Sequence, residues 1–354
     1  MSDSTRDDAG FETAGDRAAP TRPGQATMHD VAAAARVSLK TVSRVVNQES
    51  GVRPEMQKRV EDAIGSLGFR RNVAARSLRT GHRIGSIGLI VADLLNPFYS
   101  SVAKAVEGVA IRHNAVIIIG SSGENPARER ELVINLLHRP VDGLILVPAG
   151  SDHRYLEPER RLGAQIVFLD RSGGNIEADA VVLDNQGGAK QAVDHLIRRG
   201  HKRVGFVGDS ASIQTAGERL DGYKEALAEA GIAYDPELVR LGSPAVEKAE
   251  TAARQLFALD DPATAIFAGN NRQCVGVLRA IRAAQRQTAV VGFDDFELAD
   301  LLPIPVSVIA YDPAELGRAA AELLFSRMAG DARPPQRIVI PTRLIQRGSG
   351  EISA

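Results

Sequence analysis

From about residue 83 onward, short apolar runs alternate with amphipathic stretches, and this alternation constrains the fold more than any other feature. The runs include SIGLIV, AVIIIG, GLILV, IVFLD, AVVLD, VGFVGD, TAIFAG, AVVGFD and VSVIAY. The stretches between them, such as residues 101–113, 187–199 and 246–259, repeat their apolar positions with helical spacing. Buried strands separated by helices of about 10–15 residues are typical of parallel β-α-β units. The number of strands, about ten, fits two facing doubly wound sheets better than one.

Several of these runs end in a polar side chain. Ligands of open α/β sheets bind at the carboxyl ends of the strands, so these residues predict a ligand in the cleft between the two sheets. They are Asp93, Ser121, Asp170, Asp209, Asn270 and Asp294.

Composition excludes several other classes. The chain has one cysteine, Cys274, which rules out an internal disulfide and fits a reducing cytoplasm, and its seven histidines have no ligand spacing with it. We therefore expect no metal and no cofactor. No apolar run reaches the roughly 18 residues of a membrane span, and the polar N-terminus lacks a signal sequence. The first 26 residues have the composition of a disordered tail.

The segment TMHDVAAAARVSLKTVSRVVN predicts two short helices joined by a tight turn. Thr27 and Ser38 are suited to cap their N-termini, and Arg36 stands in the turn, where a positive φ would carry a mild cost. A third helix follows, with Pro54 in its first turn and Gly68 at its end.

Charge is concentrated in this N-terminal segment. Residues 28–81 hold ten basic and five acidic side chains, a net charge of +5, whereas the whole chain carries −1. A compact basic module on a mildly acidic body is typical of a polyanion-binding headpiece. In a helix-turn-helix, the N-terminal residues of the second helix face base edges in the major groove. The alternative is a surface helix of a plain three-helix bundle. The residues concerned are Ser38, Leu39, Lys40, Thr41, Ser43 and Arg44.

From Thr27 to about Ser349 the chain resembles the lactose repressor (LacI-type) family of bacterial transcription regulators. The resemblance rests on the D-V-A, A-x-V-S and T-V-S-R-V-x-N pattern of the first segment. It is supported, in order along the chain, by RRNVAARSLRTGH, NPFY, VDGLIL, VFLDR, DNQGGAKQAVDHLIRRGHKRVGFVG, RLDGYKEAL and VVGFDD.

The resemblance implies roles in DNA binding. Leu39, Lys40 and Arg44 match positions that read bases, whereas Thr41, Ser43 and Asn47 match positions that contact the DNA backbone. Residues 72–79, from Asn72 to Arg79, match a hinge helix, which is too short to be stable alone and should order on DNA as a pair. Leu78 matches the leucine that wedges into the minor groove, and Arg79 could reach a phosphate. Without the resemblance, Leu78 is better explained as a buried linker contact.

The resemblance also implies an effector site in the cleft, suited to a sugar or related polyol because carboxylates, an arginine and an amide form paired hydrogen bonds with hydroxyls. Asp170 and Asp294 have an alternative reading as strand-end caps or ion-pair partners, and Phe98 as plain core. The matched residues are Phe98, Tyr99, Asp170, Arg219, Asn270, Asp294 and Tyr311.

Three positions depart from the family pattern. The usual ANDxxA appears as GNNRQC, with Asn271 in place of the acid and Arg272 as an added cation. The strand that resembles TVRQ in the family appears as SVIAYD. Arg36 replaces the glycine of the turn between the first two helices. The first two changes bear on the effector and leave DNA binding untouched.

These patterns predict an all-α helix-turn-helix headpiece joined to an α/β body of two doubly wound parallel-sheet subdomains, like the periplasmic binding proteins. The expected parts are a disordered tail (1–26), the helix-turn-helix domain (27–71), a hinge helix and linker (72–82), and an effector-binding and dimerisation domain (83–354). Within the last, the N-subdomain should span about 83–183 and 313–330, and the C-subdomain about 184–312 and 331–350.

The expected function is a cytoplasmic, nucleoid-associated repressor that binds double-stranded operator DNA as a homodimer. No heptad tail follows the body, so a dimer is favoured over a coiled-coil tetramer. A solute-binding protein would need a signal peptide and no headpiece, the reverse of this chain. An enzyme would need a catalytic constellation, yet there is no Ser/His/Asp order, no phosphate loop and no dinucleotide fingerprint.

Overall fold

The structure, a computed structural model, describes residues 26–47, 49–69, 85–138 and 141–354 of the chain. Contacts divide the chain into two compact units, Met1–His82 and Arg83–Ala354. The predicted tail (apart from Ala26) and the predicted hinge helix lie outside the described residues.

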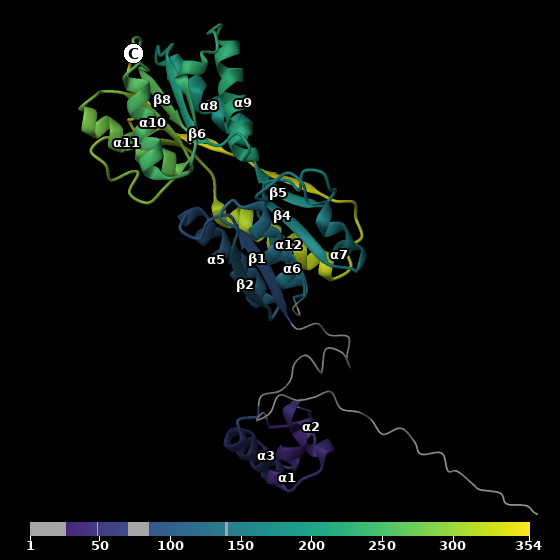
Figure 1. The fold of residues 1–354 in the computed structure, drawn as a ribbon. Coiled ribbons are helices and arrows are strands. Elements are labelled where there is room, and N and C mark those ends of the chain that lie inside the picture. The colour runs from purple at the N-terminus through teal and green to yellow at the C-terminus, as the bar shows by residue number, and fades with distance from the viewer. Residues whose placement is uncertain (1–25, 48, 70–84, 139–140) are drawn as a thin grey trace, which may run out of the picture. The chain divides into compact units, whose positions relative to one another are not determined.

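The described part of the first unit is built from three helices, α1 (Met28–Ala35), α2 (Leu39–Val46) and α3 (Pro54–Leu67) (Figure 1). Each helix contributes one fully buried valine to a shared core, namely Val31, Val42 and Val60. Ala32 and Ala35 of α1 are buried in the same core, where their small side chains let the other helices approach closely.

The ends of these helices are fixed by local hydrogen bonds. The Thr27 hydroxyl accepts from the Asp30 backbone N–H, and the Asp30 carboxylate accepts from the Thr27 backbone, which completes a capping box. Gly68 ends α3 with a φ of 61°. Arg36 ends α1 with a φ of 52°, so the left-handed turn conformation is present without a glycine.

The second unit has two lobes, each formed around a mainly parallel sheet of six strands among the described residues. The first sheet has the order β11-β5-β4-β3-β1-β2 and the second β12-β10-β9-β8-β6-β7, so the two lobes repeat one topology. The first comprises β1 (Ser86–Val91), β2 (Val116–Ser121), β3 (Gly143–Leu146), β4 (Gln165–Asp170), β5 (Asp179–Leu183) and β11 (Arg337–Ile340). The second comprises β6 (Val204–Asp209), β7 (Val239–Gly242), β8 (Ala265–Ala268), β9 (Ala289–Phe293), β10 (Ser307–Ala310) and β12 (Arg343–Ile345).

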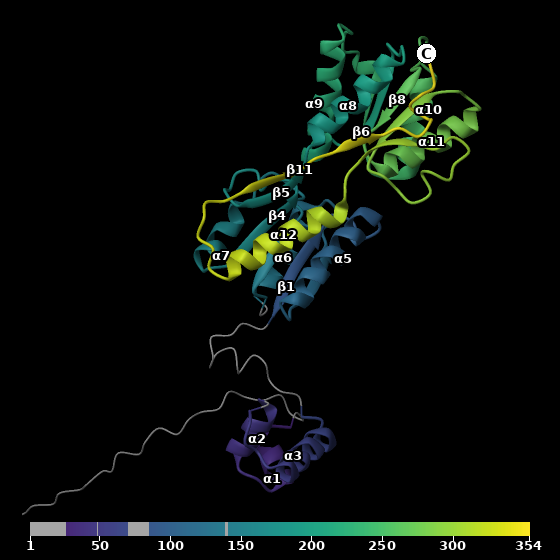
Figure 2. The ribbon, with the colours of Figure 1, turned by 180° about the vertical axis from the view of Figure 1, so that it is seen from behind.

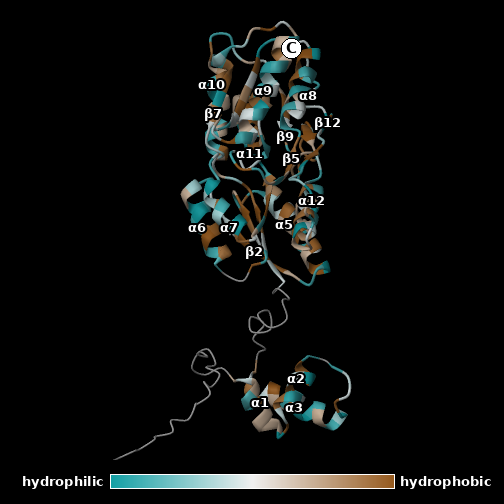
Figure 3. Cartoon of the chain, turned by 90° about the vertical axis from the view of Figure 1, so that its right-hand side faces the viewer, coloured by the Kyte–Doolittle hydropathy of each residue, from teal (hydrophilic) through white to brown (hydrophobic). Residues whose placement is uncertain are grey.

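Helices cover both faces of each sheet. In the first lobe, α5 (Pro97–Arg112) and α12 (Pro313–Met328) lie side by side on one face, opposite α6 (Pro126–Leu137) and the short α7 (Glu157–Arg161) (Figure 2). In the second lobe, α8 (Asn185–Arg198) pairs with α9 (Gln214–Glu229), and α10 (Val246–Phe257) pairs with α11 (Asn271–Ala284). Figure 3 shows hydrophobic strands enclosed by helices of mixed character. This burial on both faces explains the continuous apolar runs.

The chain crosses between the lobes three times, after β5, after β10 and after β11. The last crossing corrects one prediction. Residues 331–350 were assigned to the C-subdomain, but β11 pairs in parallel with β5 of the first sheet, from Arg337↔Ala180 to Ile340↔Leu183. β11 thus completes the edge beside β5, and β12 then pairs antiparallel with β10 in the second lobe.

None of the helices in the described ranges is long and apolar enough to cross a lipid bilayer.

The turn between α1 and α2 gives a test of backbone strain. Arg36→Gly should raise the free energy of unfolding of the first unit by about 0.5–1 kcal/mol, because glycine adopts a φ of 52° without the Cβ clash. Native-state hydrogen exchange of the α1 and α2 amides in the full chain measures this. The control Arg53→Gly removes the same charge where φ is −63° and should not stabilise; equal stabilisation by both would contradict the strain argument.

Candidate functional site

The first candidate site is the exposed face at the start of α2. Ser38 caps this helix: its hydroxyl accepts from the Thr41 N–H (3.1 Å) and lies 2.9 Å from the Thr41 hydroxyl. Leu39 is 40% exposed and Lys40 is exposed, whereas Val42 on the opposite face is fully buried. No ion pair or hydrogen bond engages the Lys40 ammonium among the described residues. The first turn of α2 therefore presents an apolar side chain and a cation to the surroundings.

Two other predicted DNA contacts are held by the unit itself. The Arg44 guanidinium donates to the Ser50 carbonyl at 2.7 Å and lies 3.7 Å from the Glu49 carboxylate. The Asn47 amide donates to the Ser43 hydroxyl at 3.4 Å. Arg44 would have to leave the Ser50 carbonyl to reach a base edge. Asn72, Leu78 and Arg79 lie outside the described residues.

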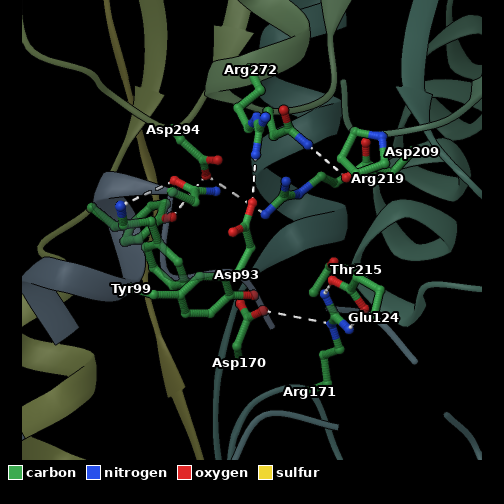
Figure 4. Close-up of a pocket in the computed structure, with 15 residues that line it drawn as sticks. Asp93, Tyr99, Glu124, Asp170, Arg171, Asp209, Thr215, Arg219, Arg272 and Asp294 are labelled. Atoms are coloured by element: carbon green, nitrogen blue, oxygen red, sulfur yellow. Dashed lines mark hydrogen bonds and ion pairs between the residues drawn. The ribbon is translucent and has the colours of Figure 1, made fainter. Parts of the chain in front are cut away.

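The second candidate site is a cavity between the lobes, at the carboxyl ends of both sheets (Figure 4). It encloses about 60 Å³, space for about five water molecules. All the residues predicted for the effector line it, namely Phe98, Tyr99, Asp170, Arg219, Asn270, Asp294 and Tyr311.

Asp170 is a buried carboxylate that faces the cavity at the end of β4. It is 5% exposed, no hydrogen-bond donor among the described residues reaches it, and the Arg171 Nε atom is 3.7 Å away. Burial raises the pKa of Asp170 to about 6, against the opposing attraction of Arg171 and Arg219. Burying a carboxylate without a donor is costly, so the arrangement favours a ligand that supplies one. Of the two alternative readings, a cap is not observed, because the Asp170 carboxylate accepts no hydrogen bond among the described residues, whereas the contact with Arg171 is an ion pair.

Tyr99 provides the complementary group beside Asp170. Its side chain, near the start of α5, is 5% exposed, and its hydroxyl makes no hydrogen bond to another described residue. Burial, together with the nearby Asp170 charge, raises the pKa of Tyr99 well above its ordinary value, so it stays a donor. A donor and an acceptor side by side match a hydroxyl, which both accepts and donates.

Arg219 is held rigidly from the second lobe. Its Nε donates to the Asn185 side chain (2.9 Å), its Nη1 donates to the Gly269 carbonyl (2.6 Å), and the guanidinium stacks 3.8 Å from the Phe293 ring centre. Its Nη2 lies 3.7 Å from the Asp294 carboxylate. This preorganised cation can donate to a ligand without losing rotamer freedom.

Asp294 repeats the position of Asp170 in the second lobe. It follows β9 as Asp170 ends β4, and both residues have a φ of 66°. Unlike Asp170, it is engaged: the Tyr311 hydroxyl donates to it at 2.8 Å. The Tyr311 ring lies 6.0 Å from Phe98, which in turn packs edge-on against Tyr99 at 4.8 Å. These aromatic rings form an apolar wall of the cavity.

Asn270 has a structural role as well as a place in the lining. It caps α11 by accepting from the Gln273 N–H (2.9 Å), and its amide donates to Asp209 at 2.7 Å. Burial raises the pKa of Asp209, which also accepts from the Gln273 side chain at 2.6 Å. The Asn270 side chain thus offers less to a ligand than its sequence position suggested.

Other lining residues were not predicted as effector contacts. Arg272 donates across the cleft to Asp93 at 2.5 Å, and the Asn271 amide donates to Asn96 at 3.0 Å. Asp93 and Asp209 were visible as strand-end residues, and Arg272 as a departure from the family pattern, but the sequence did not reveal their partners. The residues missed are Asp93, Asn96, Glu124, Arg171, Asp209, Thr215, Pro244 and Arg272.

The cavity as a whole is polar and carries more carboxylates than cations. Five carboxylates face three guanidinium groups, from Arg171, Arg219 and Arg272. Arg171 makes two 2.7 Å bonds to Glu124. No cluster of histidine, cysteine, aspartate and glutamate suited to a metal ion occurs in the part of the chain that the structure describes.

Comparisons with known proteins agree across both units. Residues 27–72 match the family model "Bacterial regulatory proteins, lacI family", and residues 193–350 match the "Periplasmic binding protein-like domain". The HTH-type transcriptional regulator CelR of Thermobifida fusca is 32% identical over 335 residues, 92% of this chain and 98% of that protein.

Two solved structures are similar over 92% of this chain. The transcriptional regulator CelR–cellobiose complex has a TM-score of 0.68 at 30% identity, with all of that chain covered. The Lac repressor dimer bound to operator and the anti-inducer ONPF has a TM-score of 0.80 at 26% identity, with 99% of that chain covered. The similar proteins are regulators and repressors, in line with the prediction that the chain is not an enzyme.

The burial of Asp170 gives a test of how much its charge destabilises the folded protein. Asp170→Asn should raise the free energy of unfolding of the unliganded protein at pH 7.5 by roughly 1–3 kcal/mol. Folding raises the pKa of the Asp170 carboxyl group from 3.8 to about 6, so its negative charge destabilises the folded state at this pH, and the substitution removes that charge. Asparagine also tolerates the φ of 66°.

The pH dependence of this difference follows from the direction of the pKa change. The folded state takes up the proton first, so the stability of the wild type rises as the pH falls through about 6 toward 4, and the advantage of Asp170→Asn shrinks. Urea unfolding at pH 7.5 and 5 measures this. The exposed, unpaired Asp260 supplies the control Asp260→Asn; a pH-independent difference would refute the argument.

Proposed function

Because the chain belongs to the lacI family of bacterial regulatory proteins, we propose that it is a repressor whose affinity for operator DNA is set by a sugar-like effector. One observation carries the proposal. The same chain holds an α2 helix with an exposed, cationic first turn and an interlobe cavity in which the Tyr99 hydroxyl and the Asp170 carboxylate have no hydrogen-bond partner among the described residues.

The exposed start of α2 is the proposed reading surface. Leu39 contacts base edges through apolar packing, and Lys40 donates to guanine O6 or N7 in the major groove. Arg44 joins them by exchanging the Ser50 carbonyl for DNA, while Thr41, Ser43 and Asn47 lie toward phosphates. The hinge contacts of Asn72, Leu78 and Arg79 are proposed from the family resemblance alone.

A homodimer is proposed because the first lobe has an apolar edge. Strand β2 ends its sheet in the described structure, and its Val116 and Ile119 side chains are 64% and 40% exposed. An unpaired apolar edge strand is a site for aggregation unless another chain covers it. The similar Lac repressor structure is a dimer bound to its operator. Two headpieces on a pseudo-palindromic operator follow from two-fold symmetry.

The proposed effector is a polyhydroxyl molecule, because the open groups of the cavity match hydroxyls. Tyr99 donates to a ligand oxygen, Asp170 accepts from a ligand hydroxyl, and Arg219 donates from the opposite lobe. The similar CelR structure is a complex with cellobiose, which supports a sugar.

Effector binding is proposed to change the angle between the lobes. Direct contacts join the lobes at Arg272–Asp93, Asn271–Asn96 and Ser172–Gln214, the last at 3.0 Å. A ligand that competes for these groups shifts the equilibrium between two lobe arrangements by its differential affinity. Operator affinity changes with that equilibrium. The protein would act on the chromosome, in the cytoplasm.

The DNA-reading surface is tested with a dyad-symmetric fragment from the gene's own upstream region. Lys40→Ala should reduce the preference for this fragment over bulk competitor DNA by about 1–3 kcal/mol, because a base contact is lost. Fluorescence anisotropy at several salt concentrations measures both affinities. Lys58→Ala, the loss of an equal exposed charge from α3, is the control and should weaken all DNA equally. Unchanged discrimination in Lys40→Ala would remove this surface from the proposal.

The dimer surface is tested by placing a charge on the apolar edge. Ile119→Asp should convert the dimer to a monomer in sedimentation velocity experiments and weaken operator binding, because a buried, unpaired carboxylate is costly at an interface. Leu162→Asp introduces the same charge at a side chain that is 83% exposed after α7 and should leave the dimer intact. A monomeric wild type, or a dimeric Ile119→Asp variant, would contradict the β2 interface.

A further inference from the structure

The cavity between the lobes is small and has a wall formed by an ion pair. Its volume of about 60 Å³ is space for about five water molecules. Glu124 and Arg171 form the wall with two 2.7 Å hydrogen bonds, and Arg171 is also anchored to the Pro148 carbonyl at 2.7 Å. A larger ligand therefore has to continue past this ion pair.

A second hollow begins on the other side of the ion pair, and we call it the outer groove. It consists of two overlapping spaces of about 280 and 900 Å³, which share Ala149, Gly150, Ser151 and Ser212. Arg171 lines both the inner cavity and the smaller space, and Glu124 lines both the inner cavity and the larger space. The inner cavity and the outer groove are thus neighbours separated by the width of one ion pair.

The outer groove, like the inner cavity, is formed by both lobes. The loop after β3, with Gly150 and Ser151, comes from the first lobe, and Ser212 and Gln214 at the start of α9 come from the second. The side chains are small, so they leave space, and the Ser151 hydroxyl has no hydrogen-bond partner among the described residues. Spaces of about 300–1,000 Å³ are typical of small-molecule sites.

A buried network fixes the first-lobe side of the outer groove. Glu129, 1% exposed, accepts from the Ala149 backbone N–H (2.5 Å) and from the Tyr155 hydroxyl (2.7 Å), and its carboxylate lies 3.1 Å from His153 Nε2. The Tyr155 ring lines the groove and carries the Arg130 guanidinium 5.3 Å from its centre. A buried carboxylate that fixes a loop backbone and an aromatic ring preorganises a surface.

We propose that the effector is a disaccharide or a longer glycoside, with one ring in the inner cavity and the linked unit in the outer groove. This inference rests on the proposed sugar-responsive function. The first ring binds Asp170, Tyr99 and Arg219, the glycosidic bond passes the Glu124–Arg171 pair, and the second unit lies between Ser151 and Ser212. Selection for the second unit then comes from the outer groove, which a free monosaccharide leaves empty.

The test compares matched sugars on the full-length wild type by isothermal titration calorimetry. The probes are glucose, galactose, xylose and ribose, and the disaccharides cellobiose, lactose, maltose and xylobiose. We expect at least one disaccharide to bind at least tenfold more tightly than each of its constituent monosaccharides. A monosaccharide that binds as tightly as every disaccharide would overturn the proposal.

Two variants place bulk in the outer groove from opposite lobes. Ser151→Trp and Ser212→Trp should each weaken disaccharide binding at least tenfold and leave the affinity for the matching monosaccharide unchanged, which also reports that the variants are folded. Ala230→Trp adds the same side chain at the exposed opposite end of α9 and should change neither affinity. Unchanged disaccharide affinity in both groove variants would overturn the two-ring proposal.

The outcomes separate this inference from the proposed function. If monosaccharides bind and the groove variants have no effect, the sugar-responsive function stands and the two-ring effector is wrong. If no sugar of either size binds the wild type, the sugar-responsive function fails, and the two-ring effector fails with it.

Discussion

Parallel strands have to be buried on both faces, and the other features of the body depend on this constraint. Helices cover both faces of each sheet, so the apolar side chains of the strands are buried inside the lobes. Polar side chains are left for the positions where the strands end. Asp93, Asp170, Asp209 and Asp294 all arrive at one cavity for this reason. Burial then gives the cavity its chemistry. It raises the pKa of Asp170 and keeps the Tyr99 hydroxyl protonated. Neither side chain makes a hydrogen bond to another described residue, so both can bond to a ligand.

The hydrogen bonds described across the cleft are few, whereas one buried apolar cluster includes side chains of both lobes. Arg272–Asp93 is partly exposed, with about a third of each side chain accessible, so water competes for both groups. Inside each lobe, by contrast, large side chains such as Phe168 and Phe206 are fully buried. Because water already competes for these polar groups, they are the lobe–lobe contacts that a small molecule can exchange most readily.

Local features of the fold were predictable from the sequence, whereas long-range pairings were not. The capping box at Thr27, the left-handed turn at Arg36 and the end of α3 at Gly68 depend on residues within a few positions of each other. Strand-end positions also predicted part of the cavity lining, namely Asp170, Asn270 and Asp294, because topology brings strand ends together, whereas the other predicted lining residues came from the family resemblance. The short strands β11 and β12 are partly exposed and have no clear apolar pattern. Their sequences therefore did not indicate which sheet each strand joins, and each pairs with the edge strand that is open to it. The Arg44 contact to Ser50, the Arg272–Asp93 pair and the buried Glu129 depend on side-chain placement that no periodicity encodes.

The equal strand order of the two lobes has a consequence for recognition. Asp170 and Asp294 occupy equivalent strand ends with the same φ of 66°, and Asp93 and Asp209 follow the equivalent strands β1 and β6. The molecule behaves as a duplicated half folded against its own copy, with an approximate two-fold relation between the halves. The copies have nevertheless diverged in chemistry. Asp294 accepts a hydrogen bond from Tyr311, whereas the Asp170 carboxylate accepts none among the described residues, so the two equivalent strand ends present unlike groups to the space between them.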